Sequence, residues 1–222
     1  MARDFNGTSG YLTSTLVSAQ QSLDTVSYSF WEYPDTVPQY RCTFSRPENS
    51  SYGARCEFDD GWGWVFIPTW TTTEGTWSLA KPSTGAWTHS VITYNYGATT
   101  NDPIWYRDGT STGLIERRTP AGTKVNNGTA FNIGRNAFAA GQYFDGRICE
   151  FGIWNRILSS GEAISLSKGL SPLFFPRGLV FYVPIIGRTS PEVELMNGAT
   201  GALTGTANQI AHPRIIYPQG AF

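Results

Sequence analysis

The chain has 222 residues, of which 14% are aromatic and 15% charged, and its formal net charge is −1. A near-neutral chain has no general electrostatic attraction to nucleic acid or to an anionic membrane, so we expect no nucleic-acid partner. No apolar run approaches the roughly 20 residues of a membrane helix, so we also expect no membrane insertion. The 24 glycines and 13 prolines favour short strands joined by tight turns.

The first part of the chain is predicted to form β-strands. Residues 5–12 read as a strand, a turn and a second strand, and residues 26–33 alternate with period two, as a half-buried strand does. Further strands are predicted at residues 61–67, 87–94, 104–109 and 131–135.

Three cysteines, Cys42, Cys56 and Cys149, cannot all pair within one chain. Cys42 and Cys56 lie in two short strand-like segments that could face each other across a hairpin. A disulfide between them is one possibility, and small buried thiols are the other.

The segment from 143 to 169 is the most informative. A turn at Asp145-Gly146 precedes a strand of alternating character, and Ser159 and Glu162 then have the spacing of a capping box, which predicts an abrupt helix start. The helix is expected over residues 160–168 and is expected to end at Gly169, because glycine suits the position after a helix.

These segments together resemble the laminin-G-like domains of the concanavalin A-like lectin/glucanase superfamily. The family's opening F-D-G-x-x-D-Y-V, internal W-H-H-V-A-V-T-Y and closing F-x-G-x-I-D-E-V-R-I-Y-N-R-A-L-S have counterparts at residues 5–12, 87–94 and 143–159. The resemblance implies an all-β, antiparallel jelly-roll sandwich with one short helix over residues 1–169. In that register four aromatic side chains should be mostly buried: Trp31, Trp87, Phe151 and Trp154.

Residues 170–222 form a C-terminal extension with an unusual pattern. Residues 178–187 and 201–205 resemble the segment with which this family usually begins, G-L-V-A-Y-W-P-L followed by G-T-L-T-G. The first strand of the family therefore has a counterpart at the end of this chain, as a permuted or exchanged strand, and residues 212–218 are expected to form an extended arm. The tail either folds back or adds to a neighbouring subunit, and its candidate contact residues are Leu179, Phe181, Ile185 and Ile186.

Enzymatic chemistry is not favoured by the sequence. Related glucanases carry two glutamates and an aspartate on one strand, where one carboxylate acts as nucleophile and another as acid. The nearest match, Glu57-Phe-Asp59-Asp60-Gly61-Trp62, lacks the second glutamate and reads better as a surface turn. Neither His89 nor His212 lies near a recognisable nucleophile motif, and we therefore expect a protein that is not an enzyme.

No cofactor is expected, although calcium is considered because many proteins of the resembled family bind it through aspartates and carbonyls. In this chain Asn6, Gly10 and Cys149 replace acids that the family's motifs carry. Asp145 and Glu150 remain as candidate metal ligands.

Glycan binding is the general activity that the resemblance implies. The available aromatic candidates are Trp62, Trp64, Trp70, Trp77 and Tyr106, with Asp59 and Asp60 as polar neighbours. Trp62 and Trp64, two residues apart on one predicted strand, are expected to face the same side, where core packing explains them as well as a sugar platform does. Loops 95–103 and 120–129 could equally carry recognition.

The start M-A-R-D-F-N-G-T-S-G-Y-L and the ending H-P-R-I-I-Y-P resemble laminin-G-like proteins encoded by tailed bacteriophages. That resemblance implies a virion surface protein, either a capsid decoration or a tail appendage, made in the host cytoplasm without a signal peptide. Its expected partners are copies of itself, other virion proteins and a cell-surface glycan. The alternatives are a free-standing carbohydrate-binding lectin and, third, a glycoside hydrolase with an unrecognised site.

Overall fold

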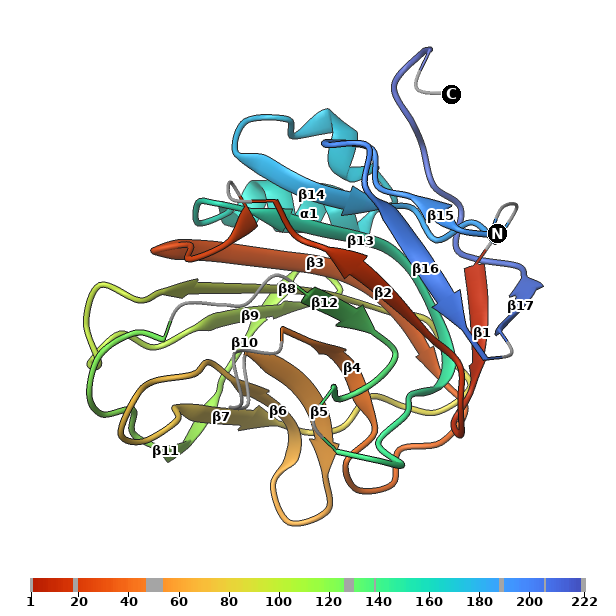
Figure 1. Ribbon diagram of the computed structural model, residues 1–222. Helices are drawn as coiled ribbons and strands as arrows, with labels where there is room; N and C mark the ends of the chain where they lie inside the picture. The colour runs from red at the N-terminus through yellow and green to blue at the C-terminus, as the bar shows by residue number, and fades with distance from the viewer. Residues whose placement is uncertain are drawn as a thin grey trace.

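The computed structural model describes residues 2–17, 20–46, 54–125, 130–137, 139–187, 190–205 and 207–220. In these residues the chain forms strands, one α-helix, α1 (Ser160–Ser167), and one 3₁₀ turn, η2 (Pro172–Phe174). The strands form two antiparallel sheets, which confirms the predicted all-β sandwich (Figure 1).

Each sheet combines strands from distant parts of the sequence. Sheet A has, in spatial order, β10 (Thr110–Thr112), β9 (Ile104–Arg107), β8 (Thr88–Asn95), β3 (Thr25–Pro34), β13 (Asp145–Trp154), β1 (Ala2–Asn6) and β17 (Ala207–Ile210), with β14 (Leu179–Val183) also paired to β13. Sheet B has β11 (Ile115–Arg118), β7 (Thr76–Leu79), β6 (Gly63–Ile67), β5 (Arg55–Asp59), β4 (Cys42–Ser45), β12 (Ala130–Ile133), β2 (Tyr11–Thr15), β16 (Thr200–Thr204) and β15 (Glu192–Val193).

Aromatic side chains fill the space between the sheets. Phe30 of β3 stacks on Phe151 of β13 with 5.4 Å between ring centroids, and Trp64 of β6 meets Trp105 of β9 at 4.6 Å. These rings are fully buried. Burial of such large rings is the main stabilising contribution to a sandwich of this size.

The expectation for the four aromatic side chains is confirmed, since none of them is exposed. Phe151 and Trp154 are fully buried, and Trp31 and Trp87 are largely buried. The even-numbered residues of β3 point into the core, so Trp31 lies on the outer face of sheet A, where its ring is 4.9 Å from that of His89.

The helix and the 3₁₀ turn pack on part of the outer face of sheet A. The predicted capping box is present: the Ser159 hydroxyl accepts a hydrogen bond from the Glu162 N–H, and the Glu162 carboxylate accepts one from the Ser159 N–H at 2.8 Å. Leu166 of α1 is buried in one cluster with Val91 and Trp154. This part of the outer face of sheet A is thereby removed from solvent.

The C-terminal extension folds back onto its own chain. β14 pairs with residues 151–154 of β13, whereas β1 pairs with residues 145–148 of the same strand. A bulge between Cys149 and Gly152 separates the two segments. Strand β16 pairs with β2 and β17 with β1, so the tail extends both sheets (Figure 1).

Buried carboxylates hold this tail in place. Glu192 accepts a hydrogen bond from Arg3 at 2.8 Å in a pair that is almost entirely buried. Glu194, fully buried, accepts bonds from the backbone N–H groups of Tyr182, Met196 and Asn197. A carboxylate that is buried away from water needs hydrogen-bond donors around it. Glu192 therefore attaches the tail to the rest of the chain, and Glu194 holds segments of the tail together.

The cysteines are buried free thiols. Strands β4 and β5 pair as the sequence suggested, but their register sets Cys42 opposite Glu57 and Cys56 opposite Phe44. The two thiols therefore do not face each other, and the possible disulfide does not form.

Candidate functional site

The outer face of sheet B carries a depression of about 340 Å³. It forms because β5, β6 and β7 alternate, with aromatic side chains pointing into the core and polar or aliphatic ones pointing outward. The residues that line it are Tyr40, Arg55, Glu57, Asp59, Trp62, Val65, Ile67, Thr76 and Arg118.

The floor of the depression contains two buried polar atoms without hydrogen-bond partners among the described residues. Glu57 is 6% exposed and Thr76 is 1% exposed. Among the described residues, nothing hydrogen-bonds to Glu57 Oε2 or Thr76 Oγ1, although both atoms are buried. Such groups normally find a partner, so a ligand that brings hydroxyl groups would satisfy them.

The protonation of Glu57 reflects its burial. Burial raises the pKa of its carboxyl group, and the nearby Arg55 guanidinium, 3.3 Å from Oε1, opposes that rise. Arg55 is itself shared with Glu74 at 2.9 Å. Glu57 is therefore a buried carboxyl group with a raised pKa that keeps one oxygen available for a hydrogen bond.

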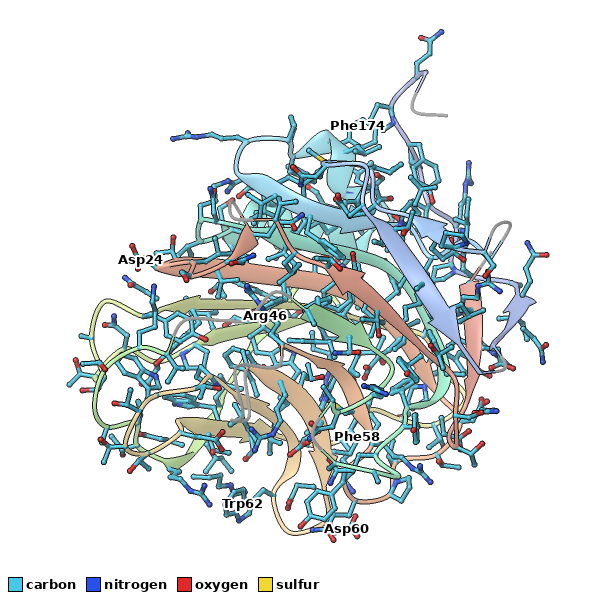
Figure 2. All side chains as sticks on the ribbon, viewed as in Figure 1. Asp24, Arg46, Phe58, Asp60, Trp62 and Phe174 are labelled. Atoms are coloured by element: carbon cyan, nitrogen blue, oxygen red, sulfur yellow. The ribbon has the colours of Figure 1, made fainter. Side chains whose placement is uncertain are left out.

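Two partly exposed aromatic rings border the depression, Tyr40 at 43% exposure and the indole of Trp62. Asp59 Oδ1 accepts hydrogen bonds at 2.8 Å from the backbone N–H groups of Gly61 and Trp62, which confirms the predicted turn. Figure 2 shows Trp62 and Asp60 near the tip of the β5–β6 hairpin, on the side of the molecule opposite Phe174. The centre of the Arg118 guanidinium lies 5.6 Å from the centroid of the Trp62 ring, in a cation–π contact.

The prediction that Trp62 and Trp64 face the same side is wrong. Trp62 precedes β6, and Gly63 has a φ of +101°, a left-handed conformation that reverses the alternation. A Cβ atom at Gly63 would come within 2.3 Å of the Leu79 carbonyl oxygen, so the turn depends on glycine. Trp64 is fully buried in the core and is not a sugar platform.

Other predicted aromatic candidates are also buried. Trp70 is 6% exposed and donates a hydrogen bond to the Tyr94 hydroxyl at 3.2 Å, while Trp77 is 1% exposed and bonds Asp102. Tyr106 is 7% exposed and packs in the cluster beneath α1. These three rings stabilise the sandwich instead of presenting a binding surface.

The predicted acidic neighbours divide between two places. Asp59 lines the depression, whereas Asp60 pairs with Lys81 at 2.7 Å. Sequence reasoning did not select Tyr40, Thr76 or Arg118 as site residues. Only their assembly on one sheet face reveals them.

The two candidate metal ligands are not brought together. Asp145 accepts a hydrogen bond from Thr36 at 2.6 Å, whereas both oxygens of Glu150 accept bonds from the hydroxyls of Tyr182 and Tyr217. Among the described residues, no three His, Cys, Asp or Glu side chains gather in a group that could hold a metal ion. The residues present do not fit a calcium site.

Loops 95–103 and 120–129 are the two loops considered for glycan recognition. Loop 95–103 borders two further depressions of about 220 and 290 Å³ that share Asp102 and Ile104. Among the described residues that line these two depressions, none has a buried polar atom without a hydrogen-bond partner, in contrast to the depression on sheet B. Residues 126–129 of loop 120–129 lie outside the described residues.

Three of the four residues proposed as contact residues of the tail are buried within the fold. Leu179, Phe181 and Ile185 are at most 5% exposed, and Ile186 is partly exposed. Because Leu179 and Phe181 belong to β14, their burial follows from its pairing with β13. These three buried side chains are not available for contacts with other chains in this arrangement.

Several solved structures share the fold. A candidate carbohydrate-binding protein from Bacteroides ovatus matches with a TM-score of 0.68 and 15% identity over 97% of this chain and 61% of its own. A heptameric SAP-like pentraxin from Limulus polyphemus matches with a TM-score of 0.58 and 14% identity over 90% and 94%. Botulinum neurotoxin type C, whose cell entry depends on two ganglioside molecules, matches with a TM-score of 0.52 and 14% identity over 72% and 42%.

At these identities the likeness shows a shared fold, and this chain spans 61% of the length of the Bacteroides protein. No curated protein matches the sequence. The family model described as the concanavalin A-like lectin/glucanases superfamily matches residues 6–163, most of the sandwich. The chain belongs to the concanavalin A-like lectin/glucanase superfamily.

Proposed function

We propose that the chain is a non-enzymatic glycan-binding module whose site is the depression on the outer face of sheet B. The observation that carries this proposal is the pair of buried atoms without partners, Glu57 Oε2 and Thr76 Oγ1, beside the accessible rings of Tyr40 and Trp62. Sugars combine hydroxyl groups with an apolar ring face. An aromatic border with a few hydrogen-bonding groups suits that combination.

The geometry favours binding over hydrolysis. Glycosidases need two carboxylates on either side of the scissile bond, one of them free to attack or to activate water. The second acid in this depression, Asp59, uses one oxygen to hold the turn of Gly61 and Trp62. The names of the similar proteins from Bacteroides and of the ganglioside-dependent toxin also support a binding role.

We further propose that this module lies on a virion surface, as a capsid decoration or tail appendage assembled in the host cytoplasm. The resemblance of both ends of the chain to proteins of tailed bacteriophages supports this setting. A heptameric protein of the same fold supports assembly into an oligomer, in which weak sites act together. None of the described helices is long and apolar enough to span a bilayer. Immunogold labelling of purified virions with an antibody against this protein tests the virion setting, and virions that carry no label would contradict it.

A glycan array tests the binding function. The protein is presented multivalently, with and without a chelator, and we expect saturable binding to one glycan class that the chelator does not change. Trp62→Ala should abolish that binding. Trp87→Ala is the matched control, because Trp87 is a partly exposed tryptophan just before β8 of sheet A, packed against Tyr33.

The outcomes separate the possibilities. Loss of binding in Trp62→Ala with retention in Trp87→Ala supports the site on sheet B. Equal loss in both variants, or retention in both, contradicts it. If the folded wild-type protein binds no glycan, the glycan-binding function is wrong.

A further inference from the structure

A bulge in the edge strand β11 brings two consecutive arginines to the same face of sheet B. Regular alternation would send neighbouring side chains to opposite faces. In β11 the register shifts between Glu116, opposite Trp77, and Arg118, opposite Thr76. Bulges re-aim side chains in this way.

The contacts of the two arginines place them beside the depression. Arg118 lines it and lies over the Trp62 ring. Arg117 donates a hydrogen bond from Nε to the Ser78 hydroxyl at 2.8 Å, and Ser78 is the direct neighbour of Val65, which also lines the depression. Glu116 instead lines a different depression, with Trp77 and Asp102.

The charge of these two arginines is not neutralised within the described part of the chain. Every ion pair formed there is made by other cations, and neither Arg117 nor Arg118 has a carboxylate within 4.0 Å. Arg55, on the opposite side of the depression, is by contrast paired with Glu57 and Glu74. The β11 side of the site is therefore its cationic side.

We propose that the site recognises a glycan that carries a carboxylate, such as a hexuronic acid or a sialic acid, with Arg118 and Arg117 binding the carboxylate. This inference rests on the proposed glycan-binding function and names its ligand class. A guanidinium matches the planar carboxylate with two parallel N–H donors, and the Trp62 ring limits the movement of Arg118. The unpartnered oxygens of Glu57 and Thr76 then take hydroxyl groups of the same sugar.

The experiment compares a hexuronic acid polymer with its carboxyl-reduced, neutral counterpart in a surface binding assay at fixed ionic strength. A sialylated oligosaccharide and its desialylated form make a second matched pair, and a sulfated polymer of similar charge density is a third probe. Wild-type protein should bind the carboxylated member of at least one pair about tenfold or more tightly than its neutral form, the size expected for charge-assisted hydrogen bonds.

Arg118→Gln and Arg117→Gln should reduce that preference by a similar factor, because they weaken binding of the acidic form more than binding of the neutral form. Arg177→Gln is the matched control, because Arg177 is exposed and lies between η2 and β14, on the sheet A side. It should retain the full preference. Unchanged thermal unfolding of each variant shows that any loss is not a loss of fold.

The outcomes of this binding assay distinguish failure of the carboxylate inference from failure of the proposed function. Equal binding of acidic and neutral forms overturns the carboxylate inference and leaves the glycan-binding function standing. Equal binding of the sulfated polymer shows recognition by charge alone and also overturns the inference. Absence of binding to every probe, together with a blank glycan array, instead contradicts the proposed function itself.

Discussion

The carboxylate of Glu150 is predicted to make the stability of this protein fall as pH rises. Glu150 lies in the bulge of β13 with a φ of +56° and is 2% exposed. Its Oε2 accepts a hydrogen bond from Tyr182 at 2.6 Å and its Oε1 accepts one from Tyr217 at 2.5 Å. Because Tyr182 belongs to β14 and Tyr217 to the C-terminal arm, one side chain links both to β13.

The magnitude follows from the pKa. Burial raises the pKa of Glu150 from 4.5 to about 7, although the two phenol hydroxyls oppose that rise. The folded state therefore holds the proton more tightly than the unfolded state, and the stabilisation present below pH 4.5 is lost as pH rises through about 7. The full loss is about 3 kcal/mol, since a tenfold change in proton affinity corresponds to about 1.4 kcal/mol.

The assay compares wild-type protein with Glu150→Gln by urea unfolding between pH 4.5 and pH 8.5. The amide keeps an acceptor and a donor for the two hydroxyls but cannot ionise. Other buried groups, such as Glu32, whose pKa burial raises to about 8, and His89, whose pKa burial lowers to about 3, titrate in both proteins and cancel in the difference.

The free energy of unfolding of Glu150→Gln, minus that of wild type, should therefore increase by about 3 kcal/mol across this range. Parallel pH profiles for the two proteins would refute the reasoning, because they would mean that Glu150 does not exchange its proton on unfolding.

Three further outcomes follow from the packing. Trp64→Ala should lower the free energy of unfolding by about 3–5 kcal/mol, because it leaves a cavity between the sheets. Trp62→Ala should lower it by less than half as much. Equal losses in urea unfolding would contradict the placement of these rings. Tyr217→Phe removes one hydrogen bond of the arm, so limited proteolysis should cut after residue 210 faster than in wild type, and an unchanged rate would argue against the link to Glu150. All three thiols are free and buried, so they should react with Ellman's reagent only after unfolding, and fewer than three reactive thiols in the denatured protein would reveal a disulfide.

Local patterns of the sequence predicted the fold well. The strand–turn–strand start, the period-two segment at 26–33 and the capping box of Ser159 and Glu162 all depend on neighbours within a few residues. For the tail the sequence left two arrangements open, fold-back and addition to a neighbouring subunit, and the pairing of β14 with β13 and of β16 with β2 shows the fold-back. Register was harder: a bulge between Cys42 and Phe44 keeps the two thiols of the hairpin apart.

The site was predicted poorly because it depends on irregular positions. A strand pattern assigned Trp62 and Trp64 to one face, but the left-handed backbone at Gly63 separates them. Arg118 reaches the depression only because of the bulge in β11. The alternation of side chains along a strand assumes a regular backbone, and both the left-handed Gly63 and the bulge in β11 break that regularity.

The coverage of the two sheets explains why the candidate site lies where it does. The helix and η2 bury apolar side chains on the outer face of sheet A, in a cluster that includes Trp154 and Tyr182. On β5 and β7 of sheet B the outward positions carry Glu57 and Thr76, which cannot form a dry interface with another apolar layer without a hydrogen-bonding partner. Both residues lie on the floor of the depression, so the glycan-binding proposal assigns their two free atoms, Glu57 Oε2 and Thr76 Oγ1, to hydroxyl groups of the ligand.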